Sequence, residues 1–121
     1  MKKLLSVLVL GFLTCNISFA DIIVSKYLKA RENGNKRINK LMDTRIGGIG
    51  VGIFWSNASI EKEKAMYCPP PKMSFTTENY INFLDQEIED QKNIGILSGE
   101  EAIGMMIIFH MREIFPCNKY K

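Results

Sequence analysis

The cysteines, the single histidine and the acidic groups are the residues of this 121-residue chain that could carry chemistry. Cys68 directly precedes three prolines, and Cys117 directly follows Pro116. A cysteine and a histidine can together form a nucleophilic pair, but only where the thiol is free to ionise. In an oxidising compartment these two thiols would be bonded to each other, which leaves His110 without a nucleophile. We therefore predict no catalytic residues and a protein that is not an enzyme.

His110 is the only histidine, and a metal site built on one imidazole needs clustered carboxylates beside it. The acidic residues that stand close together in the sequence fall into two short groups: Glu87, Glu89 and Asp90, and Glu100 with Glu101. Such groups are more typical of solvated helix faces and helix caps than of ligand sets. We predict no metal ligand and no cofactor.

Four glycines between residues 47 and 52 raise the question of a phosphate-binding loop. A dinucleotide-binding loop must follow a strand and open a helix. Here the glycines continue a helical pattern, so we expect them to serve packing instead. Gly48 and Gly52 stand four residues apart and would let another helix approach closely.

Residues 1–20 have the three parts of a bacterial secretory signal peptide. A positive start is followed by the apolar stretch Leu4 to Leu13 and by the small-x-small pattern Ser18-Phe-Ala20. We expect cleavage between Ala20 and Asp21, which predicts a periplasmic protein with no membrane association afterwards. An uncleaved anchor helix and a lipoprotein signal through Cys15 are the alternatives.

Cleavage would leave a single domain, residues 21–121. The full chain has sixteen basic and thirteen acidic residues, and cleavage removes Lys2 and Lys3, so the formal charge of the domain would be +1. That balance does not indicate nucleic-acid binding. The remaining cysteines are Cys68 and Cys117, and an even count in a small exported chain predicts a disulfide, with two free buried thiols as the alternative. Closing a loop of about 50 residues stabilises a small domain by roughly 4 kcal/mol in the chain-entropy estimate.

Apolar residues recur at helical spacing through most of the chain, and sustained strand alternation is rare, so we predict an all-α fold of about four helices. The first two helices are expected at residues 21–31 and 38–53, and a polar connection from Asn57 follows. Asn57-Ala-Ser59 also matches a glycosylation sequon, which we expect to be unmodified because the signal peptide is bacterial.

The third and fourth helices have recognisable start signals. Thr76 and Asn79 can form a capping box, with Phe75 packed on Tyr80 as a hydrophobic staple. The predicted inward face of the third helix consists of Tyr80, Ile81, Phe83, Leu84, Glu87 and Ile88. A second box, from Ser98 to Glu101, predicts that the fourth helix begins there, runs to Phe115 as the central buried helix, and ends at Pro116. If these two helices form an antiparallel hairpin, the disulfide closes its open end.

Several segments between the two cysteines follow one known pattern: Cys68-Pro-Pro70, Phe75-Thr76, Ile88-Glu-Asp90 and Ile114-Phe-Pro-Cys117. This half of the chain resembles the Rap/Tai family, immunity proteins that protect bacteria from peptidoglycan amidases of type VI secretion. The resemblance implies a helical domain that binds an exported amidase and blocks its active-site cleft. A small periplasmic acid-stress chaperone is the alternative function, and the oligomeric state stays open, a homodimer included.

The segment between the third and fourth helices, residues 90–97, is the surface that we expect to enter the amidase cleft. It would lie at the opposite end of the hairpin from the disulfide, and Gly95 would give its backbone freedom. The predicted contact residues are Asp90, Gln91, Lys92, Asn93 and Ile94. An ordinary packed connection between helices is the alternative.

Overall fold

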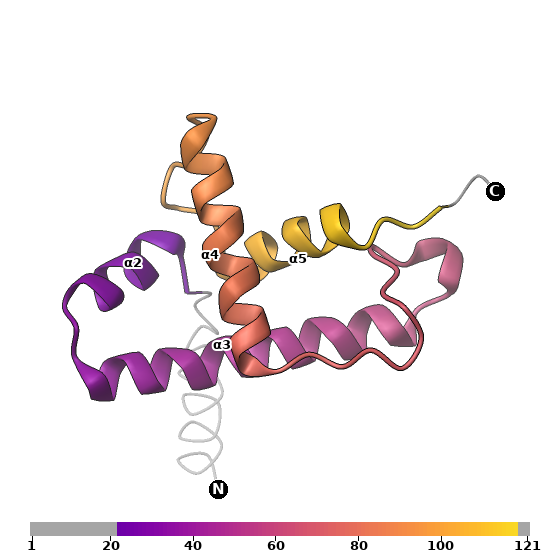
Figure 1. The fold of residues 1–121 in the computed structure, drawn as a ribbon, viewed down its shortest axis with the longest axis horizontal. Coiled ribbons are helices and arrows are strands. Elements are labelled where there is room, and N and C mark those ends of the chain that lie inside the picture. The colour runs from indigo at the N-terminus through magenta and orange to yellow at the C-terminus, as the bar shows by residue number, and fades with distance from the viewer. Residues whose placement is uncertain (1–21, 119–121) are drawn as a thin grey trace, which may run out of the picture.

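The computed structural model describes residues 22–118, and four α-helices follow one another in this part of the chain (Figure 1). They are α2 (Val24–Glu32), α3 (Lys36–Ser59), α4 (Thr77–Asn93) and α5 (Ile103–Ile114), with the short 3-10 helix η1 (Lys62–Lys64) after α3. The predicted all-α bundle is confirmed. The predicted signal peptide and its cleavage site at Ala20 and Asp21 lie outside the described residues. Within residues 22–118, no helix is long and apolar enough to cross a membrane.

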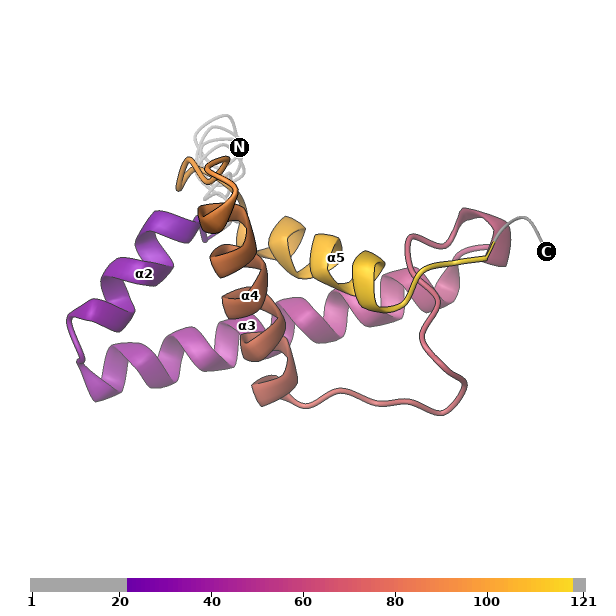
Figure 2. The ribbon, with the colours of Figure 1, turned by 45° about the horizontal axis from the view of Figure 1, so that its top comes forward.

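The long helix α3 organises the other three helices. In both Figure 1 and Figure 2, α2 folds back over the N-terminal half of α3, and α5 runs above its C-terminal half. α4 crosses α3 and α5 steeply in both views. The predicted antiparallel hairpin of the last two helices is therefore wrong, because α4 and α5 cross instead of running side by side.

The core forms where α4 and α5 meet the middle of α3. α5 contributes more of it than any other helix, through Ile103, Met106, Ile107 and Met111, which are all fully buried at helical spacing. Ile46 of α3 and Leu84 of α4 are likewise fully buried, as are Tyr80, Tyr67, Tyr27 and Val24. The prediction of a central buried helix is confirmed for α5, although its side away from the core leaves Met105 and Ile114 exposed.

Two glycines of α3 allow α4 to cross it closely. A Cβ atom at Gly50 would collide with the ring of Tyr80, and one at Gly47 would collide with the side chain of Thr77. The predicted pair, Gly48 and Gly52, has no such neighbour and is exposed, so that prediction is wrong. The reason is the direction of the buried face of α3, which passes through Gly47 and Gly50 and leaves the other two glycines on the solvent side.

The start of α4 agrees with the sequence. The Thr76 hydroxyl accepts from the Asn79 backbone N–H at 3.2 Å, and the Asn79 side chain accepts from the Thr76 N–H at 2.8 Å. Phe75 packs on Tyr80 with ring centroids 5.9 Å apart. Both the capping box and the hydrophobic staple are confirmed, because all the groups involved lie within six residues of one another.

The observed start of α5 differs from the start predicted from the sequence. The helix begins at Ile103 and not at Ser98, although the carboxylate of Glu101 does accept from the Ser98 backbone N–H at 2.7 Å. A segment distant in the sequence binds the backbone groups that the first turn of the helix would need. Residues 22–25 pair with residues 99–103, and the N–H of Val24 donates to the Glu101 carbonyl at 2.9 Å. Backbone groups used in this pairing are not available for a first turn of helix, so the residues around Glu101 form a turn instead.

Candidate functional site

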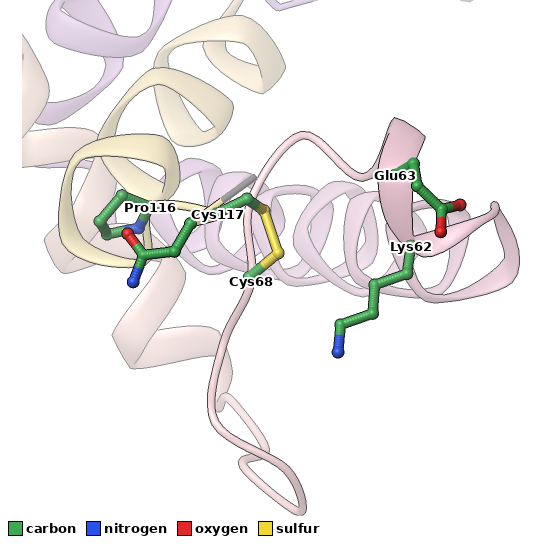
Figure 3. Close-up of a pocket in the computed structure, with 6 residues that line it drawn as sticks. Lys62, Glu63, Cys68, Pro116 and Cys117 are labelled. Carbon is green, nitrogen blue, oxygen red and sulfur yellow. A yellow bond between two sulfur atoms is a disulfide. The ribbon is translucent and has the colours of Figure 1, made fainter. Parts of the chain in front are cut away.

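One end of the molecule is fastened around the disulfide. Cys68 and Cys117 are bonded as predicted, with their Cα atoms 5.0 Å apart. The bond ties the extended segment that follows η1 to the residues beyond α5, and Figure 3 shows it between these two backbones. The Cys68 N–H also donates to the Phe115 carbonyl at 2.8 Å. The disulfide therefore holds the end of α5 against the segment that leads to α4.

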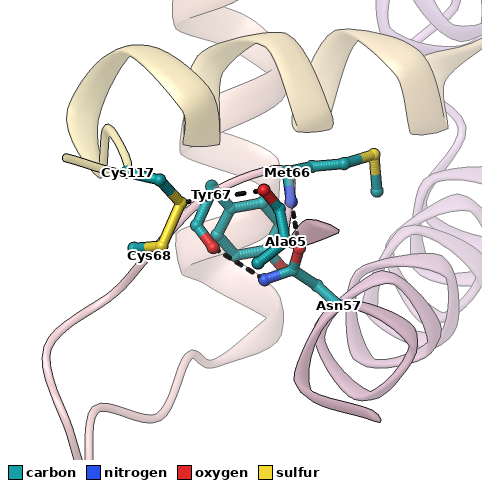
Figure 4. Close-up of a disulfide and its surroundings, with 6 residues drawn as sticks. All are labelled: Asn57, Ala65, Met66, Tyr67, Cys68 and Cys117. Atoms are coloured by element: carbon teal, nitrogen blue, oxygen red, sulfur yellow. Dashed lines mark hydrogen bonds between the residues drawn. A yellow bond between two sulfur atoms is a disulfide. The ribbon is translucent and has the colours of Figure 1, made fainter. Parts of the chain in front are cut away.

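Asn57, in the last turn of α3, binds the backbone of the two residues that precede Cys68. Its side-chain N–H donates to the Tyr67 carbonyl at 2.8 Å, and its side-chain oxygen accepts from the Met66 N–H at 2.8 Å (Figure 4). The side chain is buried, so Asn57 serves here as a structural clamp. This role was not predicted, although Asn57 continues the inward spacing of Ile46, Gly50 and the partly buried Ile53 on α3.

A cavity of about 500 Å³ lies beside the disulfide, lined by Lys62, Glu63, Cys68, Pro116, Cys117 and Asn118 (Figure 3). Both sulfur atoms in its wall are in the disulfide, so this lining offers no thiol as a nucleophile. The disulfide in this lining fastens the fold, and its sulfur atoms are not available as nucleophiles.

A buried polar pair lies between α4 and α5. Glu87 and His110 are only 5% and 6% exposed, and His110 Nδ1 lies 3.7 Å from Glu87 Oε2. The other carboxylate oxygen, Oε1, accepts a 2.6 Å hydrogen bond from the Gln91 amide. The His110 ring stacks on Phe83 with centroids 5.5 Å apart, which fixes its orientation. The predicted inward position of Glu87 is confirmed.

Asp90 and Glu113 extend this pair towards the surface. Four side chains each place one oxygen or nitrogen atom that could bind a metal ion within 4.8 Å of the others: Glu87, Asp90, His110 and Glu113. We call these four residues the polar cluster. From the sequence, the histidine and the acidic residues were interpreted separately, and Glu113 was not singled out. The sequence does contain a signal for the cluster. Glu87 and Asp90 are three residues apart and share one helix face, and His110 and Glu113 likewise share a face of the next helix.

The predicted contact segment is only partly a loop. α4 continues to Asn93, so Asp90, Gln91, Lys92 and Asn93 are helical, and the turn starts at Ile94. Gln91 is buried and its amide is bonded to Glu87, so it is not presented to a partner. Lys92 and Asn93 are exposed.

The turn after α4 exposes two large aliphatic side chains. Ile94 is 71% exposed and Ile96 is 61% exposed. Gly95 between them has a φ of +77°, so the turn does use its conformational freedom. The Ile94 N–H donates to the Asp90 carbonyl at 3.2 Å, and the Ile96 N–H donates to the Gln91 carbonyl at 3.1 Å. The two exposed side chains therefore stand on a hydrogen-bonded turn. Figure 1 shows that the end of α4, where this turn begins, projects from the bundle.

This projecting end and the polar cluster adjoin one cavity of about 440 Å³. Its lining consists of Glu87, Asp90, Gln91, Ile94, Ile96, Phe109, Arg112 and Glu113. The apolar side chains come mainly from the turn, and the charged ones come from the facing sides of α4 and α5. This region combines exposed apolar surface, a cavity and a cluster of ionisable groups, and it is the best candidate for a functional site.

Comparisons with protein-family models, with curated proteins and with solved structures find no match to this chain. The resemblance to the Rap/Tai family therefore stands on the sequence segments between Cys68 and Cys117 alone.

Proposed function

We propose that this chain is an immunity-type protein that binds an exported peptidoglycan amidase of type VI secretion and blocks its active-site cleft. The motif resemblance between Cys68 and Cys117 supplies the class of partner. The observation that carries the proposal is the exposure of Ile94 and Ile96 on the turn at the projecting end of α4. Burying such side chains against a partner removes apolar surface from water at about 25 cal/mol per Å².

The surroundings of the two isoleucines fit an interface. Lys92 and Asn93 are exposed directly beside Ile94 and can supply the polar rim that usually encloses an apolar anchor. The turn is already ordered by its backbone hydrogen bonds, so less conformational entropy would be lost when it binds. A preformed projection of this kind suits insertion into a concave active site.

Inhibition of this kind is steric and requires no chemistry from the inhibitor. The disulfide and the Asn57 hydrogen bonds would keep the region around the end of α5 rigid while the turn occupies the cleft. The substrate peptide of the cell wall could then not reach the catalytic residues of the amidase.

The proposal is tested by pull-down and inhibition assays with purified exported amidases of type VI secretion, using the mature protein. We expect Ile94→Ala and Lys92→Ala to weaken both binding and inhibition. Leu41→Ala is a matched control, because Leu41 is 56% exposed on α3, away from the turn.

Two outcomes would change the account. Binding that survives both substitutions would discard the turn as the contact surface. Failure to bind any such amidase, together with acid-dependent suppression of protein aggregation, would favour the chaperone function.

A further inference from the structure

We propose that the polar cluster, Glu87, Asp90, His110 and Glu113, binds one divalent transition-metal ion, for which Zn²⁺ is the best fit. All four residues belong to this chain. The metal site is independent of the proposed function, because the inhibitory role of the turn does not require it.

The first observation is a pair of buried polar atoms without partners. Among the described residues, Glu87 Oε2 and His110 Nδ1 have no hydrogen-bond partner, and both atoms are inaccessible to solvent. Leaving a carboxylate oxygen buried and unpaired is costly. The two atoms face each other across 3.7 Å, which is too long for a hydrogen bond. Two ligand atoms of a tetrahedral Zn²⁺ with bonds of 2.0–2.2 Å lie about 3.3–3.6 Å apart, so the separation suits a shared ion.

Asp90 and Glu113 can complete the coordination. Each lies three residues after a buried member of the pair and therefore on the same face of its helix. Ligand-type atoms of all four residues lie within 4.8 Å of one another. Asp90 and Glu113 are exposed and line the cavity with Glu87, so an ion can enter from solvent.

The charge and chemistry of the cluster select the kind of ion. Three carboxylates and the Arg112 guanidinium, which also lines the cavity, leave two net negative charges for a divalent cation to neutralise. An imidazole nitrogen favours Zn²⁺ and similar transition metals over Mg²⁺ and Ca²⁺, which prefer oxygen ligands alone.

The buried ligands are already oriented by neighbouring groups. The Gln91 amide holds Glu87 Oε1 and thereby leaves Oε2 directed at His110. Stacking on Phe83 holds the imidazole ring in place. Such supporting contacts are usual around metal ligands, because they reduce the loss of side-chain freedom on binding.

Calorimetric titration with ZnCl₂ tests the site, using mature, tag-free protein that has been stripped with a chelator. We expect one Zn²⁺ per chain. Since His110 is the only histidine, one imidazole signal reports on it, and nitrogen-15 spectra should show Nδ1 as the ligand atom. Glu87→Gln, His110→Gln and Asp90→Asn should each weaken binding at least about tenfold.

Glu89→Gln is the matched control, because Glu89 is an exposed acid on α4 outside the cluster, and it should bind like the wild type. Asp90→Asn keeps the test valid if the buried variants fail to fold, since Asp90 is exposed. Failure of the wild type to bind Zn²⁺, or equal binding by wild type and Asp90→Asn with an unchanged His110 signal, would overturn the proposal.

Discussion

Two regions of this small bundle are built differently. At the fastened end, the disulfide and the two side-chain hydrogen bonds of Asn57 join the end of α3, the extended segment and the end of α5. At the projecting end of α4, backbone hydrogen bonds shape the turn, and Ile94 and Ile96 extend into solvent. The difference suggests that stability and recognition are separated. Substitutions at the fastened end should change the free energy of unfolding, and those at the turn should change binding.

The largest effect is expected from Cys117→Ser at the fastened end. The disulfide joins residues 49 positions apart, so its loss should lower the unfolding free energy by about 2–5 kcal/mol. Urea unfolding of the variant, compared with oxidised and reduced wild type, measures this. A loss below about 1 kcal/mol would mean that the fastened end does not depend on the covalent bond.

Asn57→Ala should be the next most damaging change. It removes one buried and one partly buried hydrogen bond, leaves the Tyr67 carbonyl and the Met66 N–H without these partners, and should lower the unfolding free energy by about 1–3 kcal/mol in total. Ser56→Ala, at the exposed neighbouring position, should stay within about 0.5 kcal/mol of wild type. Equal stability of the two variants would contradict the clamp role of Asn57.

A pair of glycine substitutions tests the crossing of α3 and α4. Gly50→Ala should destabilise by about 1–3 kcal/mol, because the added methyl group overlaps the Tyr80 ring. Gly48→Ala meets no neighbour and should stabilise α3 by about 0.5–1 kcal/mol through helix propensity. Thermal unfolding of both variants should therefore show shifts of opposite sign, and shifts of the same sign would contradict the crossing point.

The smallest effect is a pH dependence at Glu101. Hydrogen bonds from the Ser98 backbone N–H, from the Ser98 hydroxyl and from the Gly99 N–H lower the pKa of Glu101 from 4.5 to about 2. The ionised form is thus favoured in the folded state, and the stabilisation is present above pH 4.5. It is lost as the pH falls towards 2. Carboxyl NMR titration gives the pKa, and Glu101→Gln should remove this part of the acid sensitivity. A pKa near 4.5 would contradict the turn geometry.

The sequence predicted features that depend on neighbouring residues and failed where distant segments decide. The start of α4 was predicted correctly because Thr76, Asn79 and Phe75 form a local unit. The start of α5 was wrong because residues 22–25 pair with the residues before it. Spacing alone could not show which side of α3 would meet α4, so the wrong glycines were chosen.

The candidate site was partly predictable for the same reason. The projecting turn with Ile94 and Gly95 follows from the end of a helical pattern. The meeting of Glu87 with His110 depends on the steep crossing of α4 and α5, which periodicity does not encode. Gln91 was expected at the surface, but it is buried and its amide donates to Glu87.

The central claim is that the turn after α4 recognises the partner while the fastened end maintains the fold. The most direct test is inhibition of the partner amidase by Ile94→Asp, with Leu41→Asp as an exposed control on α3. We predict that Ile94→Asp weakens inhibition at least about 30-fold, as expected for an interface anchor worth about 2 kcal/mol, while its unfolding free energy stays within about 0.5 kcal/mol of wild type. Leu41→Asp should inhibit like the wild type. Full inhibition by Ile94→Asp would contradict the account.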